Sequence, residues 1–152
     1  DLVVVAADIG ISKRARNMAE RLASPLAIVE KRRVDNSEEA HSLNVIGEVT
    51  GKTAIIFDDE TNTGGTLLAA VEALQGAGVE DVYACSTHGI LSGTAIRSIN
   101  NSPVKEMVIT DTLPIDPDES SLKITVLTMA PLLGEAIRRI HEGQSVGELF
   151  QG

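Results

Sequence analysis

The chain has 152 residues, of which 43% are hydrophobic and 23% are charged, and this length suits one globular domain with a real core. Its formal net charge is −9, with 13 Lys and Arg against 22 Asp and Glu, which argues against nucleic-acid binding through a basic surface. No apolar run is long enough to span a bilayer, and no signal peptide is visible. We therefore expect a single cytoplasmic domain over residues 1–152, without membrane or nucleic-acid partners.

The first third of the chain predicts three strands, one helix and a long polar loop. A buried strand over 2–7 leads to a helix with Ser12 as its N-cap. A second strand over 26–29 runs into a cluster of cations, and a third strand covers 43–49. Residues 34–42 between them are polar and acidic, and we interpret them as a mobile loop that could act as a lid.

The next stretch has the layout of a phosphate-binding turn. Residues 54–57 form an apolar, β-branched run that ends in two carboxylates, Asp58 and Asp59, and a polar turn then leads into a helix. Such a turn directs free backbone N–H groups at one point, which favours a phosphate dianion, and glycines there allow close approach. The carboxylates suit ribose hydroxyls or a divalent cation. The candidate phosphate-binding residues are Thr61, Asn62, Thr63, Gly64, Gly65 and Thr66. The alternative interpretation is a tight turn with an acidic N-cap.

Strands and helices continue to alternate in the rest of the chain. The further expected elements are a helix ending near residues 75–78, a strand over 82–85, a short helix over 93–99, strands over 107–109 and 122–127, and a helix from Pro131 to Gly143. Ser92 is the expected cap of the short helix, while Leu133, Ile137 and Ile140 mark a buried face on the last one. We expect core positions for Phe57 and Tyr83. The pattern predicts an α/β fold with a doubly wound, mostly parallel sheet and helices on both faces.

Several segments resemble, in order, the second half of the ribose-phosphate pyrophosphokinases (phosphoribosyl pyrophosphate synthetases). The matching segments are Ala7-Asp8-Ile9-Gly10, residues 26–33, residues 45–49, the turn after Asp58 and Asp59, residues 86–93, residues 108–114 and residues 138–146. They cover essentially the whole chain. The resemblance implies a phosphoribosyltransferase-type fold that binds ribose 5-phosphate, with Asp58 and Asp59 on the ribose hydroxyls and residues 61–66 on the 5-phosphate.

The same resemblance implies a reaction. Diphosphate would pass from the co-substrate ATP, with Mg²⁺, to the anomeric hydroxyl of ribose 5-phosphate, giving phosphoribosyl pyrophosphate and AMP. Lys31 and Arg33 would be the catalytic residues that stabilise the transferring group, and Asp8 would lie near the metal. The family works as oligomers and carries most of its ATP site on a first half that has no counterpart here. We therefore expect this chain to be inactive alone and a homo-oligomer in a full-length enzyme.

Three departures and two alternatives accompany this assignment. The family usually has Gly where Ile11 stands and Asp where Asn62 stands, and the loop after Arg33 is shorter and more acidic here. The alternatives are a stand-alone phosphoribosyltransferase and a non-catalytic regulatory homologue. We see no hood segment for a base, which argues against the first, and the cations of Lys31 and Arg33 argue against the second.

Overall fold

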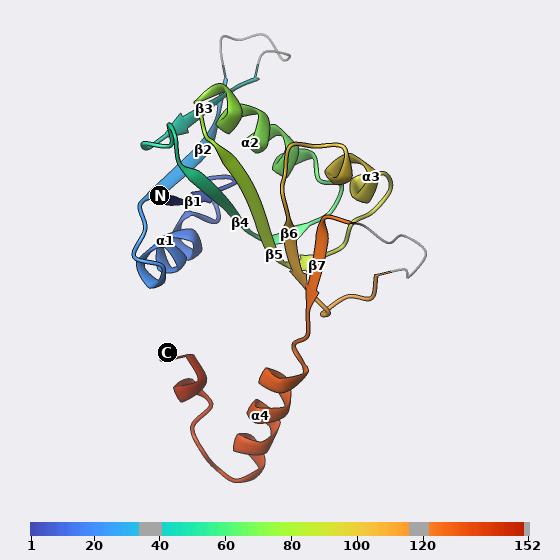
Figure 1. Ribbon diagram of the computed structural model, residues 1–152. Coiled ribbons are helices and arrows are strands. Elements are labelled where there is room, and N and C mark those ends of the chain that lie inside the picture. Colours follow the sequence, from blue (N-terminus) through green and yellow to red (C-terminus); the bar gives the residue numbers. More distant parts are fainter. Residues whose placement is uncertain (34–40, 116–121, 151–152) are drawn as a thin grey trace.

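A seven-stranded sheet lies at the centre of this computed structural model, which describes residues 1–33, 41–115 and 122–150 (Figure 1). The strand order is β3-β2-β1-β4-β5-β6-β7, and all neighbours are parallel except the antiparallel pair β2–β3. The strands are β1 (Leu2–Ala6), β2 (Leu26–Arg33), β3 (His41–Ile46), β4 (Thr53–Thr61), β5 (Asp81–Gly89), β6 (Met107–Thr110) and β7 (Ile124–Leu127). The mostly parallel α/β sheet predicted from the sequence is confirmed.

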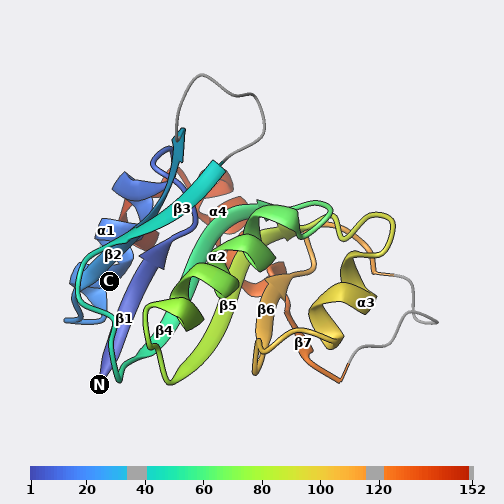
Figure 2. The same ribbon diagram turned by 90° about the horizontal axis from the view of Figure 1, so that it is seen from above.

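Helices cover the two faces of the sheet unequally. On one face, α1 (Ser12–Arg21) packs Ala15 and Ala19 against Val4 and Ala6 of β1. On the other face, α2 (Gly65–Gly76) and α3 (Ala95–Asn100) enclose the larger core, as Figure 2 shows from above. The chain ends with α4 (Ala130–His141) and a 3₁₀ turn over Gly147–Phe150.

Two helix caps expected from the sequence are wrong. Ser12 is the first residue of α1, and the N-cap is Ile11, whose backbone N–H donates to Asp8 Oδ1 at 3.2 Å. The N-cap of α3 is Thr94, which makes no side-chain cap bond, and the Ser92 hydroxyl instead donates to Asn62. Residues 34–40 of the expected lid lie outside the described residues, while residues 41 and 42 begin β3.

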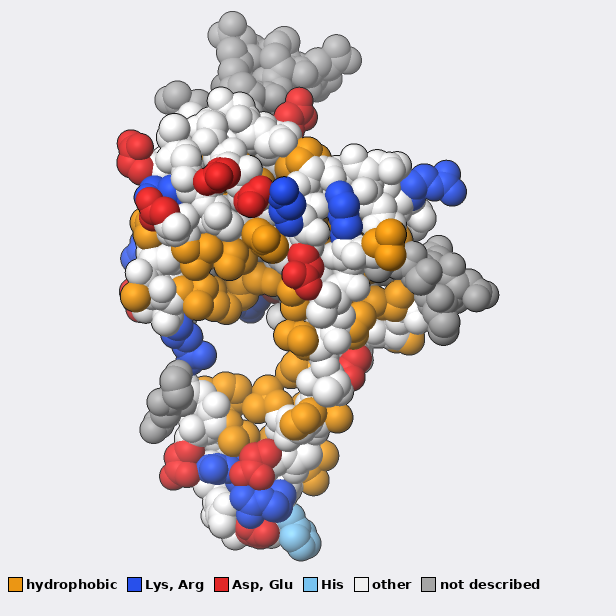
Figure 3. Space-filling view, viewed as in Figure 1, with side chains coloured by type: hydrophobic (Ala, Val, Ile, Leu, Met, Phe, Trp, Pro, Cys, Tyr) orange, Lys and Arg blue, Asp and Glu red, His pale blue; other side chains and the backbone are white. Residues whose placement is uncertain are grey.

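The last helix does not bury the face that its sequence predicts. Leu133, Ile137 and Ile140 are 55%, 67% and 68% exposed, because α4 extends away from the sheet (Figure 1). Figure 3 shows hydrophobic side chains both on the sheet face beside α1 and on the side of α4 turned toward it, with an opening between them. Phe57 and Tyr83, expected in the core, are only partly buried. No helix in the described part of the chain is long and apolar enough to cross a membrane.

Candidate functional site

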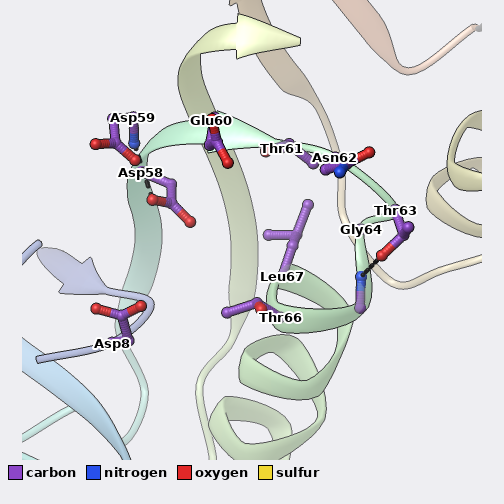
Figure 4. A pocket seen from close by; sticks show the side chains of 11 residues that line it. Asp8, Asp58, Asp59, Glu60, Thr61, Asn62, Thr63, Gly64, Thr66 and Leu67 are labelled. Carbon is purple, nitrogen blue, oxygen red and sulfur yellow. Dashed lines mark hydrogen bonds between the residues drawn. The ribbon is translucent and has the colours of Figure 1, made fainter. Parts of the chain in front are cut away.

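A cavity of about 230 Å³ lies at the carboxyl ends of β1 and β4 (Figure 4). Parallel α/β sheets bind ligands at this edge. The cavity is lined by Asp8, Asp58, Asp59, Glu60, Thr61, Asn62, Thr63, Gly64, Gly65, Thr66 and Leu67. Except for Lys31 and Arg33, which the sequence predicts to be catalytic, every site residue predicted from the sequence is therefore in one place. Glu60 and Leu67 also line the cavity and were not predicted.

The turn into α2 presents backbone amides to this cavity. Gly64 has φ +79°, a left-handed conformation that a side chain would strain, and it reverses the chain so that α2 starts at Gly65. Thr63 Oγ1 accepts a long hydrogen bond of 3.5 Å from the Gly65 N–H. The first N–H groups of a helix have no intrahelical partner, so this turn offers donors and the positive end of a helix dipole to an anion.

The acidic side of the cavity combines carboxylates from two strands. In Figure 4, Asp8 and Asp58 approach the same space from β1 and β4. Burial raises the pKa of Asp58 from 3.8 to about 6, and the charges of Asp59 and Asp8 add to this, although the Asp59 backbone N–H donates to Asp58 Oδ1 at 2.8 Å and opposes it. Asp58 is thus largely ionised at pH 7 but loses its charge under mildly acidic conditions.

Asp59 also lines a second hollow, of about 420 Å³, which shares Asp8, Asp58 and Asp59 with the first. Its Oδ2 lies 2.6 Å from Nη1 of Arg14, in the first turn of α1, and Lys13 lines the same hollow. Both cations therefore lie beside the site, and Arg14 is ion-paired with one of its acids.

Side-chain hydrogen bonds join the residues before the turn to β5 and to the β5–α3 loop. The Thr61 side chain is 6% exposed, and its hydroxyl donates to Ser86 Oγ at 3.1 Å. A direct contact between this hydroxyl and a ligand stays a prediction, and it would require that bond to break. The side chain of Asn62 accepts a hydrogen bond from the hydroxyl of Ser92, a residue that the sequence predicted only as a helix cap. The pairing of β4 with β5, which brings these segments together, could not be foreseen from either segment alone.

Comparison with known proteins identifies the family. The family model of the phosphoribosyl synthetase-associated domain matches residues 30–151. The chain belongs to this family. It is 52% identical, over 150 residues, to the ribose-phosphate pyrophosphokinase of Caldanaerobacter subterraneus subsp. tengcongensis, covering 99% of this chain and 47% of that protein. The chain thus spans about half the length of the curated relatives it matches and corresponds to their C-terminal half.

Solved structures agree with this relationship to the synthetases. The phosphoribosylpyrophosphate synthetase from Mycobacterium smegmatis is 40% identical, with a TM-score of 0.86 over 94% of this chain and 46% of that one. The orotate phosphoribosyltransferase from Aeropyrum pernix, at 20% identity over 88% of this chain and 63% of that one, has a TM-score of 0.57 and supports the phosphoribosyltransferase fold alone.

Two further features expected of a synthetase domain are the cations of Lys31 and Arg33 and a site for Mg²⁺. Lys31 and Arg33 are among the last three residues of the strand β2, but their side chains lie outside the described part of the structure. Among the described residues, no group of three or more His, Cys, Asp or Glu side chains is arranged to hold a metal ion. The nearby carboxylates of Asp8 and Asp58 fit Mg²⁺ in a different mode, since this ion commonly binds to one or two carboxylates and completes its shell with water and substrate phosphates.

Proposed function

We propose that this domain binds ribose 5-phosphate and, together with the half that its longer relatives also carry, transfers diphosphate from MgATP to the anomeric hydroxyl. The observation that supports this best is the single cavity that joins an amide-rich helix start to the acids Asp58 and Asp59. Residues 61–66 would bind the 5-phosphate, and the two acids would accept hydrogen bonds from the ribose hydroxyls. The products would be phosphoribosyl pyrophosphate and AMP.

The proposed chemistry depends on positioning and charge rather than on a covalent intermediate. Phosphoryl transfer needs the two reactants held in line and positive charge around the moving group. Lys31 and Arg33 would supply that charge, while Asp8 and Asp58 would hold Mg²⁺. When bound, Mg²⁺ would neutralise charge on the phosphate oxygens of ATP. We propose further that the enzyme acts in the cytoplasm as a homo-oligomer.

Isothermal titration with ribose 5-phosphate tests the binding step. Replacing both Asp58 and Asp59 by Ala should weaken binding by about 100-fold or more, because hydrogen bonds to charged groups contribute about 1.5–3 kcal/mol each and two are lost. Glu72→Ala, on an exposed part of α2, serves as the control and should bind normally. Unchanged affinity in the double variant would rule out this ribose site.

A coupled assay for AMP release tests the reaction. This chain with ribose 5-phosphate and MgATP should show no significant turnover, because it corresponds to 47% of the Caldanaerobacter relative. A chimera in which the chain replaces the matching half of that relative should be active. Consumption of a purine or pyrimidine base with phosphoribosyl pyrophosphate by the chain alone would instead indicate a phosphoribosyltransferase.

A further inference from the structure

Three backbone hydrogen bonds join the segment from the end of β5 toward α3 to the start of the phosphate-binding turn. The backbone N–H groups of Ile90 and Leu91 both donate to the Thr61 carbonyl at 3.0 Å, and the Ser92 N–H donates to the Asn62 carbonyl at 3.1 Å. Leu91 is held at φ +49°, an unfavourable conformation for a leucine, with its side chain 6% exposed. Buried packing and backbone bonds therefore fix Ser92 relative to Asn62.

A side-chain hydrogen bond then sets the orientation of the Asn62 amide. Ser92 Oγ donates to Asn62 Oδ1 at 2.5 Å. Within the described part of the chain, the amide nitrogen of Asn62 has no hydrogen-bond partner. In Figure 4 the amide oxygen points outward and the nitrogen lies on the side of the cavity, whose wall includes Asn62. The oxygen is thus occupied, and two N–H donors remain for a ligand.

We propose that Ser92 is a positioning residue that aims the amide of Asn62 as a donor to the phosphate of the ligand. This inference rests on the proposed function, because it assigns a role within the phosphate subsite. A phosphate dianion offers only acceptors, so the opposite amide orientation would place one oxygen against another. In the structure the Ser92 hydroxyl donates to the amide oxygen, and this contact holds the orientation in which the N–H groups lie on the side of the cavity.

Nuclear magnetic resonance titration of this chain can measure the effect, with the Gly64, Gly65 and Thr66 amides as reporters. The probes are inorganic phosphate, ribose 5-phosphate and unphosphorylated ribose. Ser92→Ala should weaken binding of both phosphate-bearing probes by about two- to tenfold, the range for one hydrogen bond, and leave ribose unaffected. Ser92→Thr, which keeps the hydroxyl, should restore binding. The hydrogen bond from the Ser92 backbone N–H to the Asn62 carbonyl does not depend on the side chain at position 92, so it remains in both variants.

A double-mutant cycle separates orientation of the amide from a merely structural role. Ser92→Ala should have no further effect on phosphate affinity when combined with Asn62→Ala, because the amide that it orients is gone. Equal losses in both backgrounds would overturn the proposal, as would unchanged phosphate affinity in Ser92→Ala, and either result leaves the proposed function intact. If neither phosphate-bearing probe shifts the reporter amides in the unaltered chain, the phosphate subsite is wrong and both proposals fail.

Discussion

Asp58 is the residue at which pH should control ligand binding. Its pKa of about 6 means that the carboxyl is neutral below that pH and ionised above it. An ionised carboxylate accepts hydrogen bonds about twice as strong as neutral ones. We therefore expect affinity for ribose 5-phosphate to fall as the pH decreases through about 6. Titrations from pH 5 to pH 8 should show this change in affinity. Asp58→Asn should remove the pH dependence that Asp58 causes and leave only the pH dependence that comes from titration of the ligand phosphate.

The same carboxyl should affect stability in the opposite direction. Its pKa rises from 3.8 to about 6 in the folded protein, so the folded state binds the proton more tightly and stability from this group is lost as the pH rises through that range. Asp58→Asn, which mimics the neutral acid, should therefore raise the melting temperature at pH 7. It should have little effect at pH 3.5, where the wild-type carboxyl is already protonated. An equal gain at both pH values would contradict the pKa shift.

Lys31 should contribute to turnover rather than to substrate binding. If its cation meets the transferring phosphoryl group only in the closed state, the contact stabilises the transition state more than the ground state. In the active chimera, Lys31→Ala should lower kcat about 100-fold or more and change KM little, as for the loss of one strong electrostatic donor. Arg16→Ala, on the exposed surface of α1, provides the control. A change confined to KM would assign Lys31 to ground-state binding.

At the scale of an element, the start of α2 depends on two neighbouring glycines for different reasons. Gly64 has φ +79°, so Gly64→Ala should destabilise the fold by about 1–2 kcal/mol. A Cβ on Gly65 would meet Thr63 Oγ1 at 3.6 Å, an ordinary contact, so Gly65→Ala should leave stability nearly unchanged while obstructing approach of the phosphate to the backbone. Urea unfolding and phosphate titration of both variants would distinguish backbone strain from obstruction of the phosphate. Equal stability of Gly64→Ala and Gly65→Ala would refute the strain assigned to Gly64.

Elements whose signals are local were predictable from the sequence, and their environments were not. The apolar run before Asp58 and the glycines after it indicated a strand, a turn and a helix start, and these all formed as expected. The helical spacing of Leu133, Ile137 and Ile140 correctly predicted α4, but periodicity reports only which side is apolar and not what covers it. The Arg14–Asp59 ion pair and the Ser92–Asn62 bond join segments 45 and 30 residues apart, which no local pattern encodes.

At the scale of the whole molecule, exposed apolar surface should make this chain self-associate. The sheet face beside α1 and the apolar side of α4 are both open (Figure 3), and soluble monomers rarely expose large contiguous apolar patches. Leu133→Glu with Ile137→Glu should shift the chain toward monomer in sedimentation experiments while leaving its melting temperature nearly unchanged. Gln144→Glu adds charge in the exposed tail and should have no effect. A monomeric wild-type chain at high concentration would contradict this expectation.

The position of β1 has a consequence for how the chain folds. This first strand lies in the interior of the sheet between β2 and β4, with Val3, Val4, Val5 and Ala6 all 0% exposed. Its pairing of Leu2 with Thr53 cannot form until more than a third of the chain has been synthesised. Such non-local contacts carry a loop-closure cost before they stabilise anything, and they slow folding. During synthesis, one edge of β1 can pair with β2 early, but its other edge must wait unpaired, exposed to aggregation or to chaperones, until β4 arrives.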